Sequence, residues 1–564
     1  MTRLLRSRSL LILPLLALTS ACAAPPASTP AAAPLTIDSP EIATVLAGVK
    51  ADQVKQHMTV LADDNMEGRG PGSAGYEHAL QYVEDAVKGY GLAPGGENGG
   101  FRQKVPLRNS VVVEEASAMS IQGAGGRKAL VYGKDFLLSA DPLREDVAIE
   151  SAPVAFIGYG VSAPALGYDD YAGGIDVKGK VVAILSGAPA KLPSNERAYY
   201  SSGAVKEAEA LKRGAIGILT FSAPDDPRFR WEVSVATSKQ GSYAWIDAAG
   251  QPNRGDPALR GSASLNHPAV ALLFAGTPTP MKNVFEAAKQ STPQAFDLPA
   301  KVSLTTKSTH KDVESANLVA TLEGSDPALK NESVVYVAHV DHFGVGVPMN
   351  GDAIYNGAHD NASGVAIVLE VARAYAALPV HPRRSIVFLF VTAEERGLLG
   401  SDFFARHPTV AKDGIVADLT LDMPFMYHPL LDIVPYGAQH SSLSVPVTNA
   451  AKKLGMAIGT DPIPEQALFI RSDHFSFVRQ GVPSLFIKSG FTTGDPSKDG
   501  AAINAAYRRD VYHKPNDDMS QAFDFEAGAS HAKLNFLTGW QVAQETARPT
   551  WNQGDFFGGL FGSK

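Results

Sequence analysis

The hydrophobic pattern is most regular in the C-terminal half of the chain, where short apolar runs alternate with amphipathic segments. Apolar, β-branched runs at 334–339, 385–392 and 415–422 predict buried strands. The other elements expected in this half are helices at 363–378, 394–406, 443–454 and 524–546, and a strand near 484–488. This alternation predicts an α/β fold, with a largely parallel or mixed sheet covered by helices on both faces.

The N-terminal part has a different pattern. A helical pattern runs from Glu41 to about Asp64, and the glycine-rich stretch MEGRGPGSAG leads into a second helix that ends near Gly91. Strand-like segments begin at Phe101. Because this part is short of a complete α/β layer, we expect residues 41–145 to pack on the later sheet as the first part of one domain.

The middle of the chain, residues 146–295, has a different pattern of hydrophobic and polar residues. Strand-like runs at 154–158, 180–185 and 216–221 surround one expected helix at 204–213. Glycine and proline turns separate the runs, and no His, Glu and Asp residues cluster there. The segment is therefore predicted to be an inserted β-rich module, with the domain resuming at 296–548. A glycine- and aromatic-rich tail, 549–564, is expected to be loosely ordered.

The overall composition narrows the class of protein. The chain has 564 residues, a net charge of −8 and 19% charged residues. These values are typical of a globular protein with two or three domains. The negative charge argues against nucleic acid as a partner.

The first residues have the pattern of an export signal, assigned to 1–23. Three arginines within the first eight residues precede an apolar run at 10–18, and Cys22 is the only cysteine. Small residues before Cys22 resemble a bacterial lipoprotein box, although Thr19 stands where Leu is preferred; ordinary cleavage after Ala23 or Ala24 is the alternative. An Ala/Pro/Ser/Thr-rich tether, 24–40, follows.

Acidic and imidazole side chains follow three successive predicted strands. His339 and Asp341 end the first strand, Glu394 and Glu395 follow the second, and Asp422 ends the third. Sites in parallel sheets lie at the carboxyl ends of the strands, and imidazole and carboxylate groups are ordinary zinc ligands. Two further stretches carry such groups, with His359 and Asp360 before a helix and His513 far downstream. The series predicts a metal site.

Six short motifs together contain these residues, and their order along the chain is typical of one protein family. In chain order they are AHVDHFG, GAHDNASG, TAEERGLLGS, LDM, RSDHFSF and YHKP. Together they resemble the two-zinc exopeptidase family, which includes bacterial leucyl-type aminopeptidases, plasma glutamate carboxypeptidases, glutaminyl cyclases and the transferrin-receptor ectodomain. In the middle segment, FIGYG, YDDY, DVKGKVVAIL and KRGAIGIL resemble the protease-associated domain that some members carry as an insertion.

The resemblance implies two zinc ions and a role for each matching residue. Asp360 would bridge the two ions, and the Asp360–Asn361 peptide bond would be cis. The other implied roles are zinc ligands for one ion (His339, Asp422), zinc ligands for the other (Glu395, His513), general base (Glu394), oxyanion donor (Tyr512) and orienter behind the ligands (Asp341).

Some positions depart from the family pattern or are not assigned by it. Thr420 stands where the family often has Asn. His342 and His359 crowd the site and are interpreted as lining residues. The roles of Asp473 and His474 stay open.

The resemblance implies an exported, zinc-dependent aminopeptidase that acts on peptides and is periplasmic, anchored to a membrane through Cys22, or secreted. A carboxypeptidase or dipeptidase is the alternative within the family, with Arg471, Lys488 and Arg508 available for a substrate carboxylate. An inactive binding protein would have lost ligands, whereas every ligand position is filled here.

Overall fold

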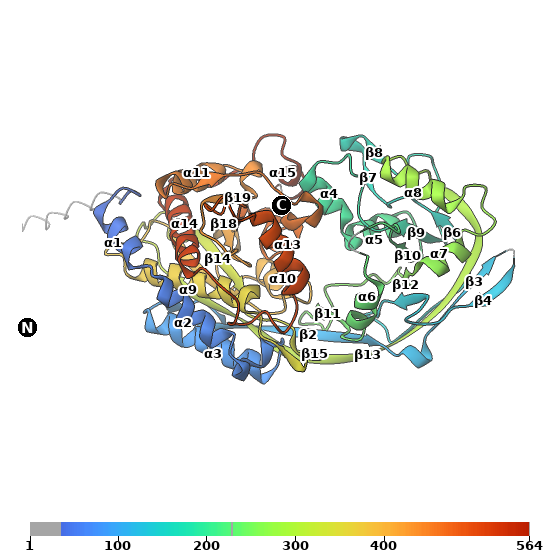
Figure 1. Cartoon of the computed structure of the whole chain (residues 1–564), viewed down its shortest axis with the longest axis horizontal. Coiled ribbons are helices and arrows are strands. Elements are labelled where there is room, and N and C mark those ends of the chain that lie inside the picture. Colours follow the sequence, from blue (N-terminus) through green and yellow to red (C-terminus); the bar gives the residue numbers. More distant parts are fainter. Residues whose placement is uncertain (1–34, 124, 227–228, 563–564) are drawn as a thin grey trace, which may run out of the picture. The chain divides into compact units, whose positions relative to one another are not determined.

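One long strand, β13 (Phe296–Leu322), belongs to two sheets and organises the fold (Figure 1). The computed structural model describes residues 35–123, 125–226 and 229–562. The predicted export signal and Cys22 lie outside these residues. Residues from Thr36 onward form one unit.

The first sheet contains the C-terminal half of β13 and the strands that the sequence predicts around the metal site. Its order is β11–β2–β13–β17–β14–β18–β21–β19–β20. The strands are β2 (Arg102–Val112), β11 (Ser242–Trp245), β14 (Ser333–His339), β17 (Ser385–Val391), β18 (Ile415–Thr420), β19 (Asp432–Tyr436), β20 (Ala457–Ile458) and β21 (Ser484–Ser489), with β1 (Ala93–Pro94) beside the end of β13. The centre, β17–β14–β18–β21, is parallel, so the predicted mixed α/β sheet is confirmed.

Helices cover both faces of this sheet, and strand β14 shows why. Successive side chains of a strand point to opposite faces. Val335 and Val337 pack with Phe404 and Phe477, from α10 (Leu399–Arg406) and α12 (His474–Val478). Between the two valines, Tyr336 points to the other face and donates a hydrogen bond to the Asn535 carbonyl of α14 (Phe525–Gln544).

The second face is covered by helices from both ends of the chain. These are α1 (Pro40–Gly48), α2 (Ala51–Leu61), α3 (Ala74–Gly89), α9 (Ser363–Ala376), α11 (Ser444–Lys453) and α14 (Phe525–Gln544). Helix α9 contacts α1, α2, α3 and α14, so the N-terminal part packs on the later sheet, as the sequence predicts. The helix expected from Glu41 is divided into α1 and α2 at Val49 and Lys50, which are extended.

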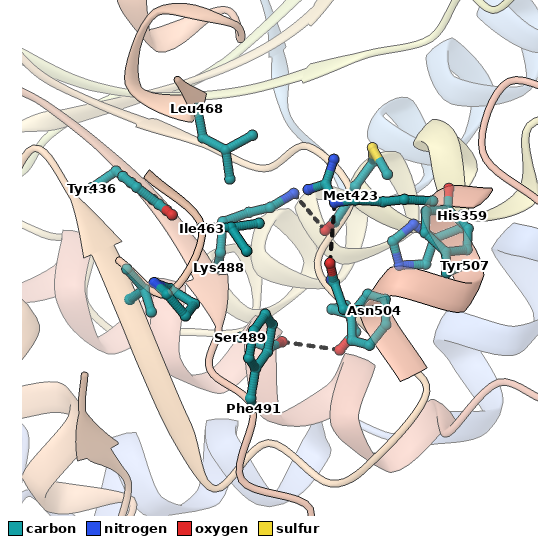
Figure 2. Close-up of a pocket in the computed structure, with 14 residues that line it drawn as sticks. His359, Met423, Tyr436, Ile463, Leu468, Lys488, Ser489, Phe491, Asn504 and Tyr507 are labelled. Carbon is teal, nitrogen blue, oxygen red and sulfur yellow. Dashed lines mark hydrogen bonds between the residues drawn. The ribbon is translucent and has the colours of Figure 1, made fainter. Parts of the chain in front are cut away.

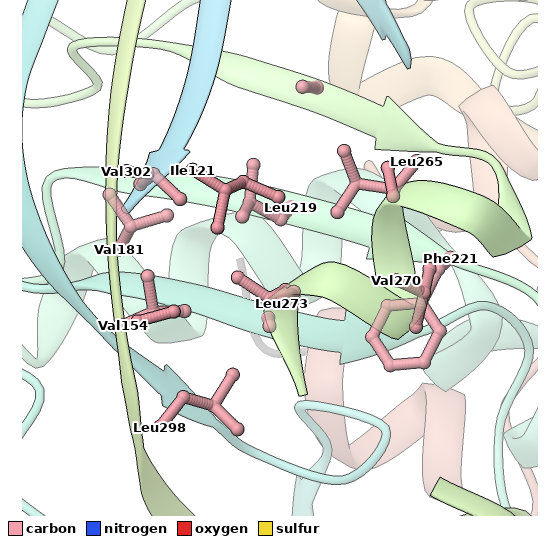
Figure 3. Close-up of a cluster of buried hydrophobic side chains, with 14 of the residues drawn as sticks. Ile121, Val154, Val181, Leu219, Phe221, Leu265, Val270, Leu273, Leu298 and Val302 are labelled. Carbon is pink, nitrogen blue, oxygen red and sulfur yellow. The ribbon is translucent and has the colours of Figure 1, made fainter. Parts of the chain in front are cut away.

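The second sheet is built on the N-terminal half of β13. Its strands run in the order β4–β3–β13–β6–β9–β10–β12–β5. They are β3 (Ala118–Gly123), β4 (Gly126–Ala129), β5 (Phe136–Leu138), β6 (Asp146–Phe156), β9 (Val181–Leu185), β10 (Gly217–Phe221) and β12 (Ser262–Leu265). Its core packs residues such as Leu219, Phe221, Val270 and Leu273 (Figure 3).

The middle segment holds more helix than the sequence pattern indicates. Where one helix was expected, the structure has α4 (Ser194–Ser201), α5 (Gly203–Lys212), α6 (Trp231–Ser238), α7 (His267–Leu273) and α8 (Met281–Lys289). Helix α7 has only seven residues, HPAVALL, and such a short apolar run does not distinguish a helix from a strand. The prediction of a single helix in this segment is therefore wrong.

The strands also cross the predicted boundaries at 146 and 295. Strands β3 to β5 precede residue 146 and yet pair within the second sheet, because β13 continues through both sheets. In the opposite direction, β11 lies inside the middle segment and pairs with β2 of the first sheet. The division into a peptidase domain and a protease-associated insertion stays a prediction.

Residues 549–562 are not loosely ordered, which corrects the prediction for the part of the tail that the structure describes. Helix α15 (Phe556–Phe561) lies within it, and its Phe557 is fully buried against Phe469 and Phe475. Three phenylalanines and a leucine in six residues supply enough apolar area to dock this short helix. Within the described part of the chain, no helix has the length and apolar character needed to cross a bilayer.

Candidate metal centre

The candidate site lies at the carboxyl edge of the first sheet. His339 is the last residue of β14, Glu394 and Glu395 follow β17, and Asp422 follows β18. Because these strands are parallel and adjacent, their ends meet at the same edge. Asp360 reaches this edge from the irregular turn η5 (Ala358–Ala362), which opens α9.

Two imidazole–carboxylate sets share Asp360. His339 Nε2 lies 3.4 Å from Asp360 Oδ1 and 3.5 Å from Asp422 Oδ1. On the other side, His513 Nε2 lies 3.2 Å from Asp360 Oδ2 and 3.5 Å from Glu395 Oε2. Each oxygen of Asp360 thus belongs to a different set.

These separations fit a tetrahedral metal ion in each set. Zinc bonds to imidazole and carboxylate of about 2.0–2.2 Å place neighbouring ligand atoms roughly 3.3–3.5 Å apart. His339 Nε2 and Asp422 Oδ1 are buried and have no hydrogen-bond partner among the described residues. Buried polar atoms without partners are costly, and a metal ion would satisfy both of these.

The charges of the site also fit cations. Burial and the charge of Asp360 raise the pKa of Glu395 to about 8. Burial, together with Glu395 and Asp422, raises the pKa of Glu394 well above its usual range. Carboxylates this close repel one another unless positive charge lies between them.

The tautomer of His339 follows from its second ring nitrogen. Nδ1 lies 3.1 Å from the backbone carbonyl oxygen of Asp341, which can only accept a hydrogen bond. Nδ1 therefore carries the proton, and the lone pair of Nε2 faces Asp360 and Asp422.

Asp341 lies behind the two glutamates rather than behind the His339 ring. Its carboxylate is 3.9 Å from the His339 ring, too far for a hydrogen bond. Instead, the backbone N–H groups of Glu394 and Glu395 donate to its two oxygens, at 3.0 and 3.3 Å. Asp341 thus fixes the turn that presents both glutamates.

That turn explains why the helix expected from residue 394 begins only at Leu399. Ala393, Gly397 and Leu398 have positive φ angles, which a helix does not allow. Met423 and His513, beside or within the ligand sets, also have positive φ. Such conformations concentrate at functional sites, where the surrounding structure enforces them.

Of the two histidines interpreted as lining residues, His342 lies closer to the site than expected. Its Nδ1 is 2.7 Å from Glu395 Oε1, and with Asp360 and Glu395 it forms a group able to hold a metal ion. His359 is fully buried among aromatic rings, and neither of its nitrogens has a partner in the described part of the chain.

Tyr512 stacks on His513, with ring centroids 3.6 Å apart. Burial and the charges of nearby carboxylates raise the pKa of Tyr512 well above its usual range, so the phenol keeps its proton. Asp473 is fully buried, and neither of its carboxylate oxygens has a partner in the described residues. The His474 Nε2 lies 2.6 Å from the Phe469 carbonyl oxygen.

Two residues that sequence reasoning did not assign hold the loop that carries Asp360. Arg69 is buried and donates to the carbonyls of Leu61, Val340, Asn356 and Gly357. The carboxylate of Asp517 accepts from the backbone N–H groups of His359 and Asp360, at 2.9 and 3.0 Å. Arg69 stands in the stretch MEGRGPGSAG and Asp517 lies two residues after the motif YHKP, but neither stretch has a local pattern that shows the contact.

The peptide bond between Asp360 and Asn361 is cis, which confirms that prediction.

The middle segment also touches the glutamate turn. Arg254 donates to the backbone carbonyls of Arg396 and Gly397. Trp245 donates from Nε1 to Asp402 Oδ2 of α10, at 2.9 Å.

A pocket opens beside the first ligand set (Figure 2). Apolar side chains such as Phe425, Ile463 and Leu468 form much of its wall. His359 and Met423, each next to a candidate ligand in sequence, also line it, as do the cationic Lys488 and Arg508.

Comparison with known proteins shows which proteins the C-terminal half of the chain resembles. Residues 317–536 match the model of Peptidase family M28. A probable zinc metalloprotease of Pyricularia oryzae is 41% identical over 261 residues, which is 41% of this chain and 50% of that protein. The Leupeptin-inactivating enzyme 1 of Streptomyces exfoliatus is 28% identical over 213 residues, 37% of this chain and 44% of that protein. The matched region thus spans about half the length of these relatives.

The fold is shared over a larger part of the chain. The solved aminopeptidase from Aneurinibacillus sp. strain AM-1 is 18% identical and has a TM-score of 0.52, covering 89% of this chain and 96% of that one. The residues of the two candidate ligand sets lie at or beside the same carboxyl edge of the first sheet. All of them fall inside the matched region 317–536. Residues 317–536 are thus assigned to Peptidase family M28, and curated relatives of this region are named zinc metalloproteases.

Proposed function

We propose that this protein is an exported, zinc-dependent aminopeptidase that removes N-terminal residues from peptides. One observation supports it above all others: two imidazole–carboxylate sets share Asp360 at separations that suit two metal ions. Its relatives are named as metalloproteases and aminopeptidases.

Each ion has a defined set of residues in this proposal. His339, Asp360 and Asp422 hold one ion, and His513, Asp360 and Glu395 hold the other. When bound, such a pair supplies Lewis acidity, which activates water and polarises a carbonyl group. His342, bonded to Glu395, orients that ligand from behind.

Glu394 is the general base in the proposed mechanism. It lies within reach of His339 and Asp422, and Asp341 fixes its backbone. Its carboxylate takes a proton from the attacking water and delivers it to the leaving amine. Tyr512 keeps its phenolic proton and donates a hydrogen bond to the oxygen that becomes negative in the transition state.

A carboxypeptidase or dipeptidase is the second candidate. The observation that favours it is the presence of Lys488 and Arg508 in the pocket beside the ligands, where a terminal carboxylate would find cations.

Two reporters distinguish these candidates. Purified protein with added zinc is tested side by side on amino-acyl p-nitroanilides and on peptides whose only scissile bond is C-terminal. Hydrolysis of the first and about two zinc ions per chain are expected, with loss of activity after chelation. Activity on the second reporter alone would favour the carboxypeptidase, and full activity after complete removal of metal would contradict both.

Export rests on the N-terminal pattern and Cys22 alone. With lipidation of Cys22, the protein fractionates with membranes and takes up labelled palmitate, whereas Cys22→Ala loses the label. If the unchanged protein and Cys22→Ala fractionate alike and the unchanged protein takes up no labelled palmitate, the signal is removed by ordinary cleavage. Peptides are the proposed substrates, and lipid on Cys22 is the only membrane contact proposed.

A further inference from the structure

The pocket beside the first ligand set contains two cationic side chains among apolar walls. Lys488 lies at the end of β21, and Arg508 lies on α13 (Gly500–Asp510). Both line the pocket together with Asn504 and His359, and the ring nitrogens of His359 have no hydrogen-bond partner among the described residues. Cations are rare in apolar surroundings unless they bind an anion or a set of acceptors.

The ammonium group of Lys488 has one donor to spare. It donates to the backbone carbonyls of Asp422 and Met423, at 2.7 and 2.8 Å, and the bond to Met423 is visible in Figure 2. An ammonium group has three donors. Because two of them hold the backbone at Asp422, the third lies directly beside the candidate metal ligands.

Arg508 has more donors to spare. Its Nε donates to Asn504 Oδ1 at 3.1 Å, and no acceptor within the described residues bonds to its terminal nitrogens. Among those residues, no carboxylate lies within ion-pair distance of Arg508 or Lys488. The nearby Asp461 is engaged elsewhere, since it accepts from the hydroxyl of Tyr436 and the backbone N–H of Ile463.

We propose that this pocket binds a carboxylate of the substrate, and that the carboxylate is the side chain of an N-terminal aspartate or glutamate. Arg508 supplies a two-pronged contact of the kind that planar carboxylates favour, and Lys488 adds a single donor. The apolar walls hold the methylene groups of that side chain. This inference rests on the proposed aminopeptidase function and specifies its substrate class.

The position of the pocket is the reason for choosing a side chain. Lys488 bonds to Asp422 itself, so the pocket adjoins the place where the scissile carbonyl must sit. In an aminopeptidase, the side chain next to that carbonyl belongs to the N-terminal residue. The free carboxylate of a short peptide is the other source of the same chemistry, and the experiment separates the two.

The first arm compares substrates that differ only in charge. The kcat/KM values of the zinc-loaded protein are measured on glutamyl and glutaminyl p-nitroanilide, and their ratio isolates the carboxylate. We expect a ratio above about 10 in the unchanged protein and a fall of roughly 10- to 100-fold in that ratio for Arg508→Gln. Arg509→Gln is the matched control, because Arg509 is exposed on the same helix and pairs with Asp510; it should keep the ratio. A ratio near one in the unchanged protein overturns the inference.

The second arm compares peptides with free and amidated C-termini. If only the free forms are cleaved, and Arg508→Gln removes that preference, the pocket binds a terminal carboxylate and the acidic side chain is wrong. If both forms are cleaved alike, the terminal carboxylate is excluded as the ligand.

A third arm does not depend on turnover. Calorimetry measures the binding of free glutamate and free glutamine to the zinc-loaded protein. Tighter binding of glutamate, lost in Arg508→Gln and kept in Arg509→Gln, supports the inference even if no peptide is hydrolysed, in which case the proposed function alone fails. Equal binding of the two amino acids overturns the inference whatever the activity.

Discussion

Replacing Glu394 by Gln tests the assignment of the general base against the alternative that Glu394 is a ligand. The change removes one charge and keeps the size and the backbone bond to Asp341. Glu394 lies in the same group as His339 and Asp422, so its position alone does not separate the two roles. Metal content and rate separate them together.

We expect Glu394→Gln to lower kcat strongly and to leave the zinc content nearly unchanged. Positioned general bases contribute about 10²–10⁴-fold, so kcat should fall by that factor, about 2.7–5.4 kcal/mol in the barrier. Zinc content should remain about two ions per chain, because the ligand sets around Asp360 are unchanged. Glu395→Gln is the contrast, and it should lose about one ion, since Glu395 faces His513 at 3.5 Å.

A third possible role for Glu394 is that of a structural ion-pair partner. The free energy of unfolding separates this role from that of the general base. Burial and neighbouring carboxylates raise its pKa, so the charged form destabilises the fold. Metal-free Glu394→Gln should therefore be at least as stable as the unchanged protein near neutral pH in urea unfolding. A clear loss of stability, a lost zinc ion, or a near-normal rate would each refute the assignment.

Three further predictions concern the surroundings of the site. Arg69→Met should lower the free energy of unfolding by about 3–5 kcal/mol in urea titrations, because it leaves buried carbonyls without their donor. Burial lowers the pKa of His531 to about 3, so between pH 3 and 6.5 the unfolded chain binds one more proton than the folded chain. The free energy of unfolding therefore falls as pH falls, by up to about 1.4 kcal/mol per pH unit. His531→Asn should reduce this acid-side slope of the free energy of unfolding against pH. Arg254→Gln should lower kcat by roughly 3- to 10-fold with zinc content unchanged, because the carbonyl of Gly397 loses its donor; an unchanged kcat would show that this contact does not position the glutamate turn.

The strands at the site could be predicted because their signal is local. The run predicted at 334–339 is β14, Ser333–His339, and polar residues that follow parallel strands must meet at one edge. The turn after β17 was missed because the residues that follow the strand read as a helix, while positive φ angles at Ala393 and Leu398 delay the helix. A local pattern of residue types does not reveal such angles.

The supports of the site could not be predicted, because their contacts join distant parts of the chain. Arg69 bonds to Val340 and Gly357, which are 271 and 288 residues away in sequence. Asp517 bonds to His359 and Asp360 over more than 150 residues. Periodicity reports which face of an element is buried, and it contains no information on which distant partner covers that face.

The middle segment is tied to the first sheet and to the glutamate turn. Its strand β11 pairs with β2, and without it β2 would present an open edge to solvent. Deleting residues 146–295 would also leave the N-terminal half of β13 without β6, its longest partner in the second sheet. Since Arg254 reaches the glutamate turn from the same segment, the sheet that continues through β13 links the second core to the residues proposed to bind metal. A substitution in the core of the second sheet should therefore lower kcat, because β13 and β11 connect that core to the site. A substitution on the solvent side of α8 should leave kcat unchanged.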